Sequence, residues 1–450
     1  MKSLRPSKPS PVAIERSRKM STYVGKPILR YDGVGHVTGR TTYVDDVHLS
    51  RMLYIKVLRS PVHKGMIRKL DVSAAENMPG VAGVITAKDV PGTNAYGLVP
   101  DQPVFPSENI RYKGERLAAV AAVDEDTAME AIEKIKLDIE EQTPVFNPVE
   151  AMEPGAPQVT PEGNLAEFNS GKSRIVRFGD VERGFAEAKH IVEGRYTQAT
   201  NDHVSMEPHA SVAYIDSTDR LAIHTCSQDL YFHLGMLSAI LDMPMNKIRY
   251  IGGTIGGGFG GKNDIHCDHV AGVMALKIRK PVKYRLTRKE DLLYSTKRGG
   301  YIFDYKDGVD KNGRLVARKI RVIHDAGAYA GMGPYIVEKM IVFVAGPYWI
   351  PNVWFDGYSV YTNKPLCSSM RAFGAANCAA ATETQMNRIA EVTGMDPWEL
   401  RFINAWRDGD TGPTHWKVVA AGAIEAMKKA AELAGIELPD HLKAMSSQGR

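Results

Sequence analysis

Cysteine is scarce in this sequence, and long apolar runs are missing. The 450 residues include four cysteines, Cys226, Cys267, Cys367 and Cys378, and no two of them form a CxxC pair. This spacing excludes a four-cysteine iron–sulfur cluster of the usual local kind and suits a reducing compartment. No stretch approaches the roughly 20 consecutive apolar residues that span a bilayer. We therefore expect a cytoplasmic protein.

The net charge is also small, at +5 over the whole sequence. Much of the positive excess lies in residues 1–19, which hold six Lys or Arg residues and one Glu among prolines and serines. This composition predicts a disordered tail over residues 1–22, and without an apolar run it is not a secretory signal. Met20 offers an alternative start codon. The remaining residues are nearly neutral, which argues against a nucleic-acid-binding protein.

Strand and helix signals alternate over residues 23–148. Residues 52–60, 80–89 and 115–123 predict strands, because they are short apolar runs rich in strand formers or small residues. Residues 124–135 predict a helix, since an acidic first turn precedes apolar residues at helical spacing. The string KLDIEE that follows alternates like an edge strand. This interleaving indicates an α/β domain.

A proline-rich segment separates that domain from the rest. Five prolines fall within residues 143–164, and we expect an extended linker over residues 149–172 because proline fixes φ and removes a donor. Strand and helix signals return over residues 173–436, so the predicted fold class is α+β. The predicted strands are 220–225, 247–253, 281–287, 314–324 and 354–362, and the predicted helices are 268–278, 378–394 and 420–435. Residues 437–450 are expected to be a frayed tail.

The densest local signal is a glycine loop, residues 251–263, in which seven of thirteen residues are glycine. It lies between a predicted strand and a predicted helix, where free backbone N–H groups can face a ligand. Gly256, Gly258 and Gly261 satisfy GxGxxG, a weak match in so glycine-rich a string. Gly256, Gly261 and Lys262 satisfy most of a phosphate loop, but Asn263 replaces the Ser or Thr that should hold magnesium. A tight turn without a ligand is the third interpretation.

Other sequence motifs in the same chain help to interpret the glycine loop. GGGFGGK (256–262), read with SMRAFGA (369–375), resembles the molybdopterin-binding subunits of the xanthine dehydrogenase and aldehyde oxidase family. HVSMEPHASVA (203–213), SQDLY (227–231) and MDPWELRFINA (395–405) support this, as do YVDDV, RYKGERLAAVAA, RKPVKYRLTRKED and HDAGAYA. The strings occur in family order over roughly residues 25–435. The resemblance implies an α/β hammerhead domain over residues 23–148 and the first part of a molybdenum cofactor-binding domain over residues 173–436.

The resemblance also assigns residues to the cofactor. Gln228 matches the glutamine that approaches the metal's oxo ligand, where a neutral amide donates without adding charge. Backbone N–H groups of Gly257, Gly258, Phe259 and Gly260 would face the cofactor. Arg371 matches the arginine beside the molybdenum, whose fixed positive charge suits anionic surroundings. The protein itself would ligate no metal.

Three further positions would contact the substrate. Phe373 matches the aromatic residue that contacts planar substrates in the purine-oxidising members. Asn263 replaces a glutamate of those members, and Lys339 replaces their substrate-orienting arginine. A lysine pairs with a carboxylate but not in bidentate fashion. We therefore expect a smaller N-heterocycle, an aromatic acid or an aldehyde in place of xanthine.

One nearby cluster invites a different assignment. His266, Cys267, Asp268 and His269 are zinc-ligating residue types, but they lack a second ligand pair at the usual spacing. A polar helix start is the favoured interpretation. Cys367 is interpreted as structural.

The resemblance implies partners. Family large subunits continue for several hundred residues, and that further part carries most pterin contacts and the catalytic base. Divided subunits exist in the family, as in the nicotinate dehydrogenase type. We therefore expect a second molybdopterin-binding polypeptide, a [2Fe–2S] subunit and an FAD subunit. The cofactor would be molybdenum–molybdopterin, with the cytosine dinucleotide form one candidate. The alternatives are a P-loop-like nucleotide-binding protein and a truncated, inactive family member.

Overall fold

The computed structural model describes residues 23, 25–169 and 171–448. The chain divides into an N-terminal unit that ends at Thr42 and a large unit from Tyr43 onward. The N-terminal unit contains the short helix α2 (Gly33–Val37), and the basic tail predicted for residues 1–22 lies outside the described residues. No helix within the described ranges is long and apolar enough to cross a membrane. All that follows concerns the large unit.

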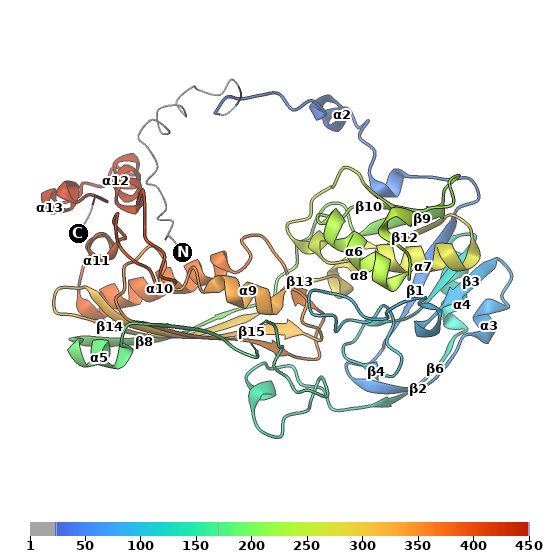
Figure 1. Ribbon diagram of the computed structural model, residues 1–450, viewed down its shortest axis with the longest axis horizontal. Coiled ribbons are helices and arrows are strands. Elements are labelled where there is room, and N and C mark those ends of the chain that lie inside the picture. Colours follow the sequence, from blue (N-terminus) through green and yellow to red (C-terminus); the bar gives the residue numbers. More distant parts are fainter. Residues whose placement is uncertain (1–22, 24, 170, 449–450) are drawn as a thin grey trace, which may run out of the picture. The chain divides into compact units, whose positions relative to one another are not determined.

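The centre of one half of the large unit is a seven-stranded mixed sheet (Figure 1). Its strands, in spatial order, are β11 (Ile248–Gly252), β10 (Leu221–Thr225), β9 (Ala210–Ile215), β12 (Val282–Arg285), β1 (Leu53–Arg59), β5 (Arg116–Ala122) and β3 (Val81–Ile85). β1 pairs in parallel with β12, with Leu53 opposite Val282. Strands from both sides of the proline-rich segment therefore share one sheet. The domain limits predicted from the sequence stay predictions.

Helix α7 (Asp268–Ile278) fixes the end of the glycine loop to this sheet. It packs on β9, β10 and β12 and buries almost every side chain along its length, including Val270, Ala271 and Met274. Burying side chains of this size contributes about 1.5–3 kcal/mol for each large apolar one. Helix α6 (Leu230–Ile240) lies beside β11. The chain that leads into α7 therefore has a fixed end point.

A smaller sheet follows the pattern read from the sequence. It has the order β4 (Asn109–Ile110), β2 (Gly65–Asp71) and β6 (Lys136–Glu141), so the string KLDIEE forms an edge strand as predicted. The predicted helix at 124–135 is α4 (Glu125–Glu133), which is capped by Asp124 through the Thr127 N–H at 2.7 Å. The short helix α3 (Ser73–Glu76) packs beside α4.

The proline-rich segment lies against the second large sheet. Val145, Ala151 and Val159 are buried in one cluster with residues of β15 and β16. The Val145 N–H donates to Asn363 Oδ1 at 2.9 Å, which satisfies a backbone donor that no strand ladder serves. The segment is therefore anchored along its length by side chains.

The second large sheet has five strands (Figure 1). They are β7 (Arg174–Phe178), β16 (Val353–Tyr361), β15 (Leu315–Gly327), β14 (Tyr301–Val309) and β8 (His190–Gln198), in that order. β15 and β16 were predicted, whereas β8 and β14 were not. Figure 1 shows α9 (Gly333–Met340) and α10 (Ala375–Thr393) over one face of the sheet and α5 (Val181–Glu187) over the other.

A short parallel ladder brings the second sheet's chain to the glycine loop. Lys297 of β13 (Lys297–Arg298) pairs with Cys367 of β17 (Cys367–Ser368). β13 follows α8 (Arg288–Tyr294), and β17 leads through residues 369–374 into α10. The remaining elements are α11 (Pro397–Asn404), α12 (Ala423–Leu433), α13 (Asp440–Ala444) and the 3₁₀ turns η2 (Val44–Asp46), η3 (Ala87–Asp89), η4 (Glu150–Met152), η5 (Met245–Lys247) and η6 (Gly261–Asn263).

The described part of the C-terminal segment differs from the expected frayed tail. Leu438 and Leu442 are buried in a cluster with Phe402 and Ile424. The Ser447 N–H donates to Glu425 Oε1 at 3.0 Å. The apolar spacing in this segment is too short to reveal a helix in the sequence, but it is enough to dock one.

Candidate functional site

The glycine loop (residues 251–263) crosses from β11 to η6 in an unusual backbone conformation. Gly257 and Gly260 both have φ of 97°, and Phe259 between them has φ of 53°. The left-handed region costs a non-glycine residue roughly 1–2 kcal/mol, so the surrounding structure must hold Phe259 there. Phe259 is 45% exposed, so its ring is not an ordinary core anchor.

Gln228 is bound to this loop by its carbonyl oxygen. Gln228 Oε1 accepts the Gly260 N–H at 2.9 Å and the Lys262 N–H at 3.3 Å, and the Gln228 backbone N–H donates to the Lys262 carbonyl at 2.9 Å. Because Oε1 faces two donors, the amide NH₂ must point away from the loop. The side chain is exposed, and no acceptor in the described part of the chain binds its Nε2. A Cβ on Gly258 would lie 2.3 Å from Gln228 Oε1, so a larger residue there would displace the Gln228 amide.

The loop presents free backbone donors. Within the described ranges, the N–H groups of Gly257, Gly258 and Phe259 donate to no acceptor. The Gly260 N–H was also expected to face the cofactor, but it donates to Gln228 Oε1 instead. Successive free N–H groups at a turn form a concavity that suits an anionic or strongly polar group.

A second segment, residues 369–373, runs beside the glycine loop. The Arg371 N–H donates to the Phe259 carbonyl at 2.8 Å, and a Cβ on Gly260 would lie 2.9 Å from Met370 Cα. Ala372 and Phe373 have φ of 76° and 44°, a second pair of left-handed non-glycine residues. The Arg371 side chain is exposed, and no described acidic side chain pairs with it. Such clustering of strained residues is typical of functional sites.

The predicted substrate residues gather next to this segment. Lys339 Nζ lies 5.1 Å from the centroid of the Phe373 ring, and the Tyr335 and Phe373 ring centroids are 5.5 Å apart in a T-shaped arrangement. We call Tyr335, Lys339 and Phe373 the aromatic wall. Asn263 Nδ2 donates to Ser369 Oγ at 3.3 Å, which places it between the glycine loop and residues 369–373. The structure thus brings every predicted site residue to three adjoining segments, the turn between β10 and α6, the glycine loop and residues 369–373, and to helix α9. Their roles remain predictions.

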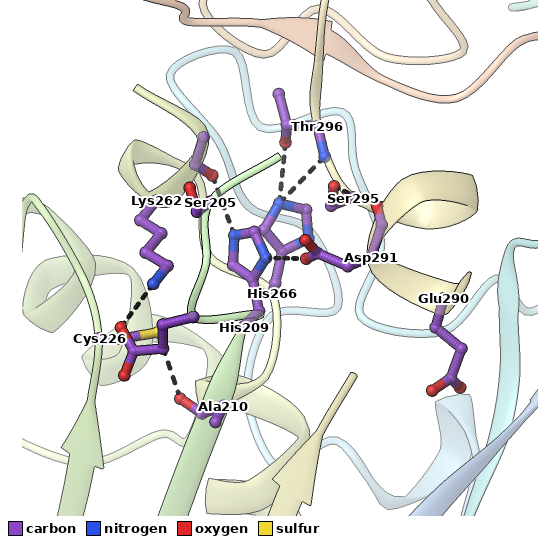
Figure 2. A network of polar contacts seen from close by, with 12 residues as sticks. Ser205, His209, Ala210, Cys226, Lys262, His266, Glu290, Asp291, Ser295 and Thr296 are labelled. Atoms are coloured by element: carbon purple, nitrogen blue, oxygen red, sulfur yellow. Dashed lines mark hydrogen bonds and ion pairs between the residues drawn. The ribbon is translucent and has the colours of Figure 1, made fainter. Parts of the chain in front are cut away.

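Behind the glycine loop lies a buried polar network that sequence reasoning missed (Figure 2). Lys262 Nζ lies 2.7 Å from Glu207 Oε2, with the two side chains 1% and 8% exposed. Lys262 is therefore neither a surface charge nor available to a phosphate, which removes the support for a phosphate loop. Glu207 lies 55 residues away in the sequence. No local spacing could have revealed this pairing.

His209 completes the network. Its Nδ1 lies 2.6 Å from Asp291 Oδ1, and its Nε2 lies 3.1 Å from the Gly261 carbonyl oxygen. Both ring nitrogens therefore lie within hydrogen-bond distance of an oxygen atom. Although burial opposes it, the hydrogen bond and charge of His209 keep the pKa of Asp291 below its ordinary value.

The four residues that suggested zinc point to separate partners. His266 Nε2 lies 2.9 Å from Thr296 Oγ1, and its ring meets the His209 ring edge-on at 4.4 Å (Figure 2). The His269 ring instead packs on Tyr96, with centroids 4.8 Å apart. Burial raises the pKa of the Cys267 thiol well above its usual value and lowers that of His266. A protonated thiol is a poor metal ligand.

Comparison with known proteins decides the family. Residues 165–405 match the family model for the molybdopterin cofactor-binding domain, and residues 38–143 match that for the aldehyde oxidase and xanthine dehydrogenase a/b hammerhead domain. The chain belongs to the xanthine dehydrogenase and aldehyde oxidase family. The predicted resemblance and the predicted α+β fold class are confirmed.

Relatives in this family of oxidoreductases differ in length. The chain is 36% identical to a probable xanthine dehydrogenase subunit of Bacillus subtilis, over 90% of this chain and 55% of that one. It is 33% identical to the nicotinate dehydrogenase large molybdopterin subunit of Eubacterium barkeri, over 91% of this chain and 96% of that one. The aldehyde oxidoreductase structure from Desulfovibrio gigas matches with a TM-score of 0.86 and 28% identity, over 93% of this chain and 47% of that one. The chain thus spans about half the length of the Bacillus and Desulfovibrio relatives.

The residues present fit a molybdopterin cofactor. The outward NH₂ of Gln228 and the free N–H groups of Gly257, Gly258 and Phe259 form a donor set without net charge. The exposed Arg371 adds a positive charge close by. This combination suits the oxo ligands and phosphate of an anionic cofactor.

Proposed function

We propose that this chain is the molybdopterin-binding subunit of a heteromeric molybdenum hydroxylase. The observation that carries the proposal is the orientation of Gln228, whose amide oxygen is bound inside the glycine loop while its NH₂ faces outward. When bound, the cofactor supplies the redox chemistry that transfers oxygen from water to an electron-poor carbon. The chain's own part is to hold the cofactor and one wall of the substrate pocket.

Each side of the site has a separate task. Gln228 would hold the cofactor's metal centre through its outward NH₂, and the loop N–H groups of Gly257, Gly258 and Phe259 would hold the cofactor beside it. Arg371 balances negative charge at the cofactor. Donors that are fixed before the reaction cost no reorganisation as charge develops.

The aromatic wall orients the substrate. The Phe373 ring contacts a planar heterocycle or aromatic aldehyde, with Tyr335 supporting its edge. Lys339 is exposed and has no acidic partner in the described part of the chain, whereas its neighbour Glu338 lies 3.3 Å from Arg174. The wall therefore carries an uncompensated positive charge that suits an anionic substituent on the substrate. Asn263, which donates to Ser369 Oγ, is the third proposed substrate contact.

The catalytic base and the remaining pterin contacts belong to a second molybdopterin-binding polypeptide. Subunits with [2Fe–2S] and FAD groups would be the further partners and would supply the electron acceptors. Support comes from the Eubacterium barkeri relative, which this chain covers over 96% of its length and whose name marks it as the large one of its molybdopterin subunits. The cofactor is a molybdenum–molybdopterin, with the cytosine dinucleotide among its candidate forms.

Isotope transfer tests the proposed reaction. The assembled enzyme is incubated in ¹⁸O-labelled water with nicotinate, with nicotinamide and with benzaldehyde, and the product masses are measured. A molybdenum hydroxylase incorporates the label from water into the product, with nicotinate favoured over nicotinamide. Product oxygen derived from O₂, or no product from any of the three, contradicts the proposal.

A further inference from the structure

The buried ion pair of Glu207 and Lys262 ties the middle of the glycine loop to its C-terminal end. Glu207 Oε2 accepts the Gly256 N–H at 2.7 Å and lies 2.7 Å from Lys262 Nζ. The Glu207 backbone N–H donates in return to the Gly256 carbonyl at 3.0 Å. Glu207 therefore holds Gly256, in the middle of the loop, by two hydrogen bonds and Lys262, near its end, by an ion pair.

Lys262 carries this constraint forward to Gln228. Its backbone N–H donates to Gln228 Oε1, and its carbonyl accepts the Gln228 N–H. The same residue is thus fixed at its ammonium group and at both of its peptide groups. Lys262 therefore connects the buried ion pair to the peptide that orients the Gln228 amide.

Stability alone does not account for this pair. Replacing a buried ion pair by apolar residues is often neutral or stabilising. In addition, Glu207 Oε1 is buried with no hydrogen-bond partner among the described residues, which is itself a cost. A benefit other than stability is needed to explain why two charges are buried behind this loop.

We infer that Glu207 and Lys262 are positioning residues, whose ion pair sets the orientation of the Gln228 amide and the display of the loop N–H groups. This inference rests on the proposed function for its meaning, because the groups that it positions are those assigned to the cofactor. Its geometry stands on the chain alone. Neither residue touches the reacting atoms.

Three variants separate positioning from stability. Glu207→Gln keeps an acceptor for the Gly256 N–H but leaves the ammonium group unpaired, Lys262→Met leaves the carboxylate unpaired, and the double variant removes both charges. Asp307→Asn is the matched control, because the Asp307–Arg318 pair is equally buried, at 2.7 Å, in the five-stranded sheet. We expect Glu207→Gln, Lys262→Met and Asp307→Asn each to unfold at a lower temperature than wild type. The double variant at positions 207 and 262 should recover much of the loss.

Amide hydrogen exchange of the full chain provides a readout that needs no cofactor. In Glu207→Gln and Lys262→Met, exchange of the hydrogen-bonded amides of Gly256, Gly260, Lys262 and Gln228 should rise by about a hundredfold, whereas Asp307→Asn leaves it unchanged. The double variant should remain unprotected there although its melting temperature recovers. Restored protection in the double variant, or unchanged exchange around Gln228 in the single ones, overturns the inference.

The molybdenum-loaded complex gives the second readout. The Mo(V) electron paramagnetic resonance signal after dithionite reduction should shift in Glu207→Gln and in the double variant and stay unchanged in Asp307→Asn. An unshifted signal in both pair variants contradicts the inference. If the wild-type complex holds no molybdenum, the proposed function fails, whereas the exchange experiment still decides whether the pair orients the loop.

Discussion

The glycine loop and the aromatic wall face the same site but are built in opposite ways. Along the glycine loop, Gln228 and Lys262 have partners within the chain, and the Lys262 side chain is 1% exposed. Along the wall, Tyr335 is 44% exposed, and the Lys339 ammonium group lies over the Phe373 ring without an acidic partner among the described residues. The glycine loop is fixed by hydrogen bonds within the chain, whereas the aromatic wall presents exposed groups that a ligand can contact.

This difference matches the two tasks of the proposed site. Donors near a metal must be held in place before the reaction, because their contribution depends on alignment. A substrate wall gains more from exposed surface that the ligand covers. Substitutions on the loop side should therefore lower kcat or cofactor content, and those on the wall should change KM.

The largest effect is expected from Gln228. Gln228→Glu keeps the two acceptor contacts with the Gly260 and Lys262 N–H groups but removes the outward NH₂. Loss of one such preorganised donor lowers kcat by about 10²–10³-fold. Steady-state kinetics of the assembled enzyme measure this, and an unchanged melting temperature shows that the fold is intact. A kcat within twofold of wild type would remove Gln228 from the site.

Gly258 provides the next test of the rigid side. A Cβ at this position would overlap Gln228 Oε1, and forced overpacking of this kind costs about 1–3 kcal/mol. We expect Gly258→Ala to lower the melting temperature and the molybdenum content together. Gly253→Ala in the same loop is the control, because a Cβ there meets nothing within 4 Å. Equal behaviour of the two variants contradicts a close contact between the loop and Gln228.

Asp264, which directly follows the glycine loop, is a buried carboxyl group that lowers the stability of the fold at neutral pH. Burial raises its pKa to about 6, and its Oδ2 has no hydrogen-bond partner among the described residues. Because its folded pKa lies above the unfolded value of 3.8, the folded state binds the extra proton, and wild-type stability falls as pH rises from about 4 through 6. Asp264→Asn should therefore unfold less easily than wild type at pH 7.5, by about 2 kcal/mol, and lose this advantage below pH 4.

Urea unfolding at several pH values measures this difference. Asp216→Asn is an informative control, because hydrogen bonding from Thr218 lowers the pKa of the half-buried Asp216 to about 2. That variant should lose stability at neutral pH. The same sign of effect in both variants contradicts the assigned burial of Asp264.

The smallest effect is expected on the wall. Lys339→Met should raise KM for nicotinate by about threefold to tenfold, since an exposed charge pair contributes little. The KM for benzaldehyde should not change, and kcat should stay the same for both. A fall in kcat with both substrates would show that the wall shares the fixed character of the loop.

Much of the fold was open to prediction from the sequence. Strands β1, β5, β10 and β15 are uninterrupted apolar or alternating runs, and α4 and α10 have clear helical spacing. Strand β14 was not predicted, because Asp304, Lys306 and Asp307 interrupt its apolar residues. In the sheet, Asp307 is buried in an ion pair with Arg318 of the neighbouring strand β15. Such a pairing is invisible without knowledge of the register.

The candidate site residues were proposed one by one through family resemblance. The residues that hold them in place, such as Glu207 and His209, were not predicted. Gln228, the glycine loop and Arg371 belong to strings that resemble the family's own. Glu207 and His209 act through partners 52 to 82 residues away in the sequence, and only the fold brings them together. The direction of the Gln228 amide likewise depends on two backbone N–H groups that no sequence pattern encodes.

The central claim is that this chain contributes one part of a shared molybdopterin site. The most direct measurement is the molybdenum and pterin content of the chain purified alone and co-purified with the second molybdopterin-binding polypeptide. We predict little of either in the chain alone and stoichiometric amounts in the pair, with the pair's content lowered by Gly258→Ala but not by Gly253→Ala. Stoichiometric cofactor on the chain alone, or none on the pair, would contradict the account.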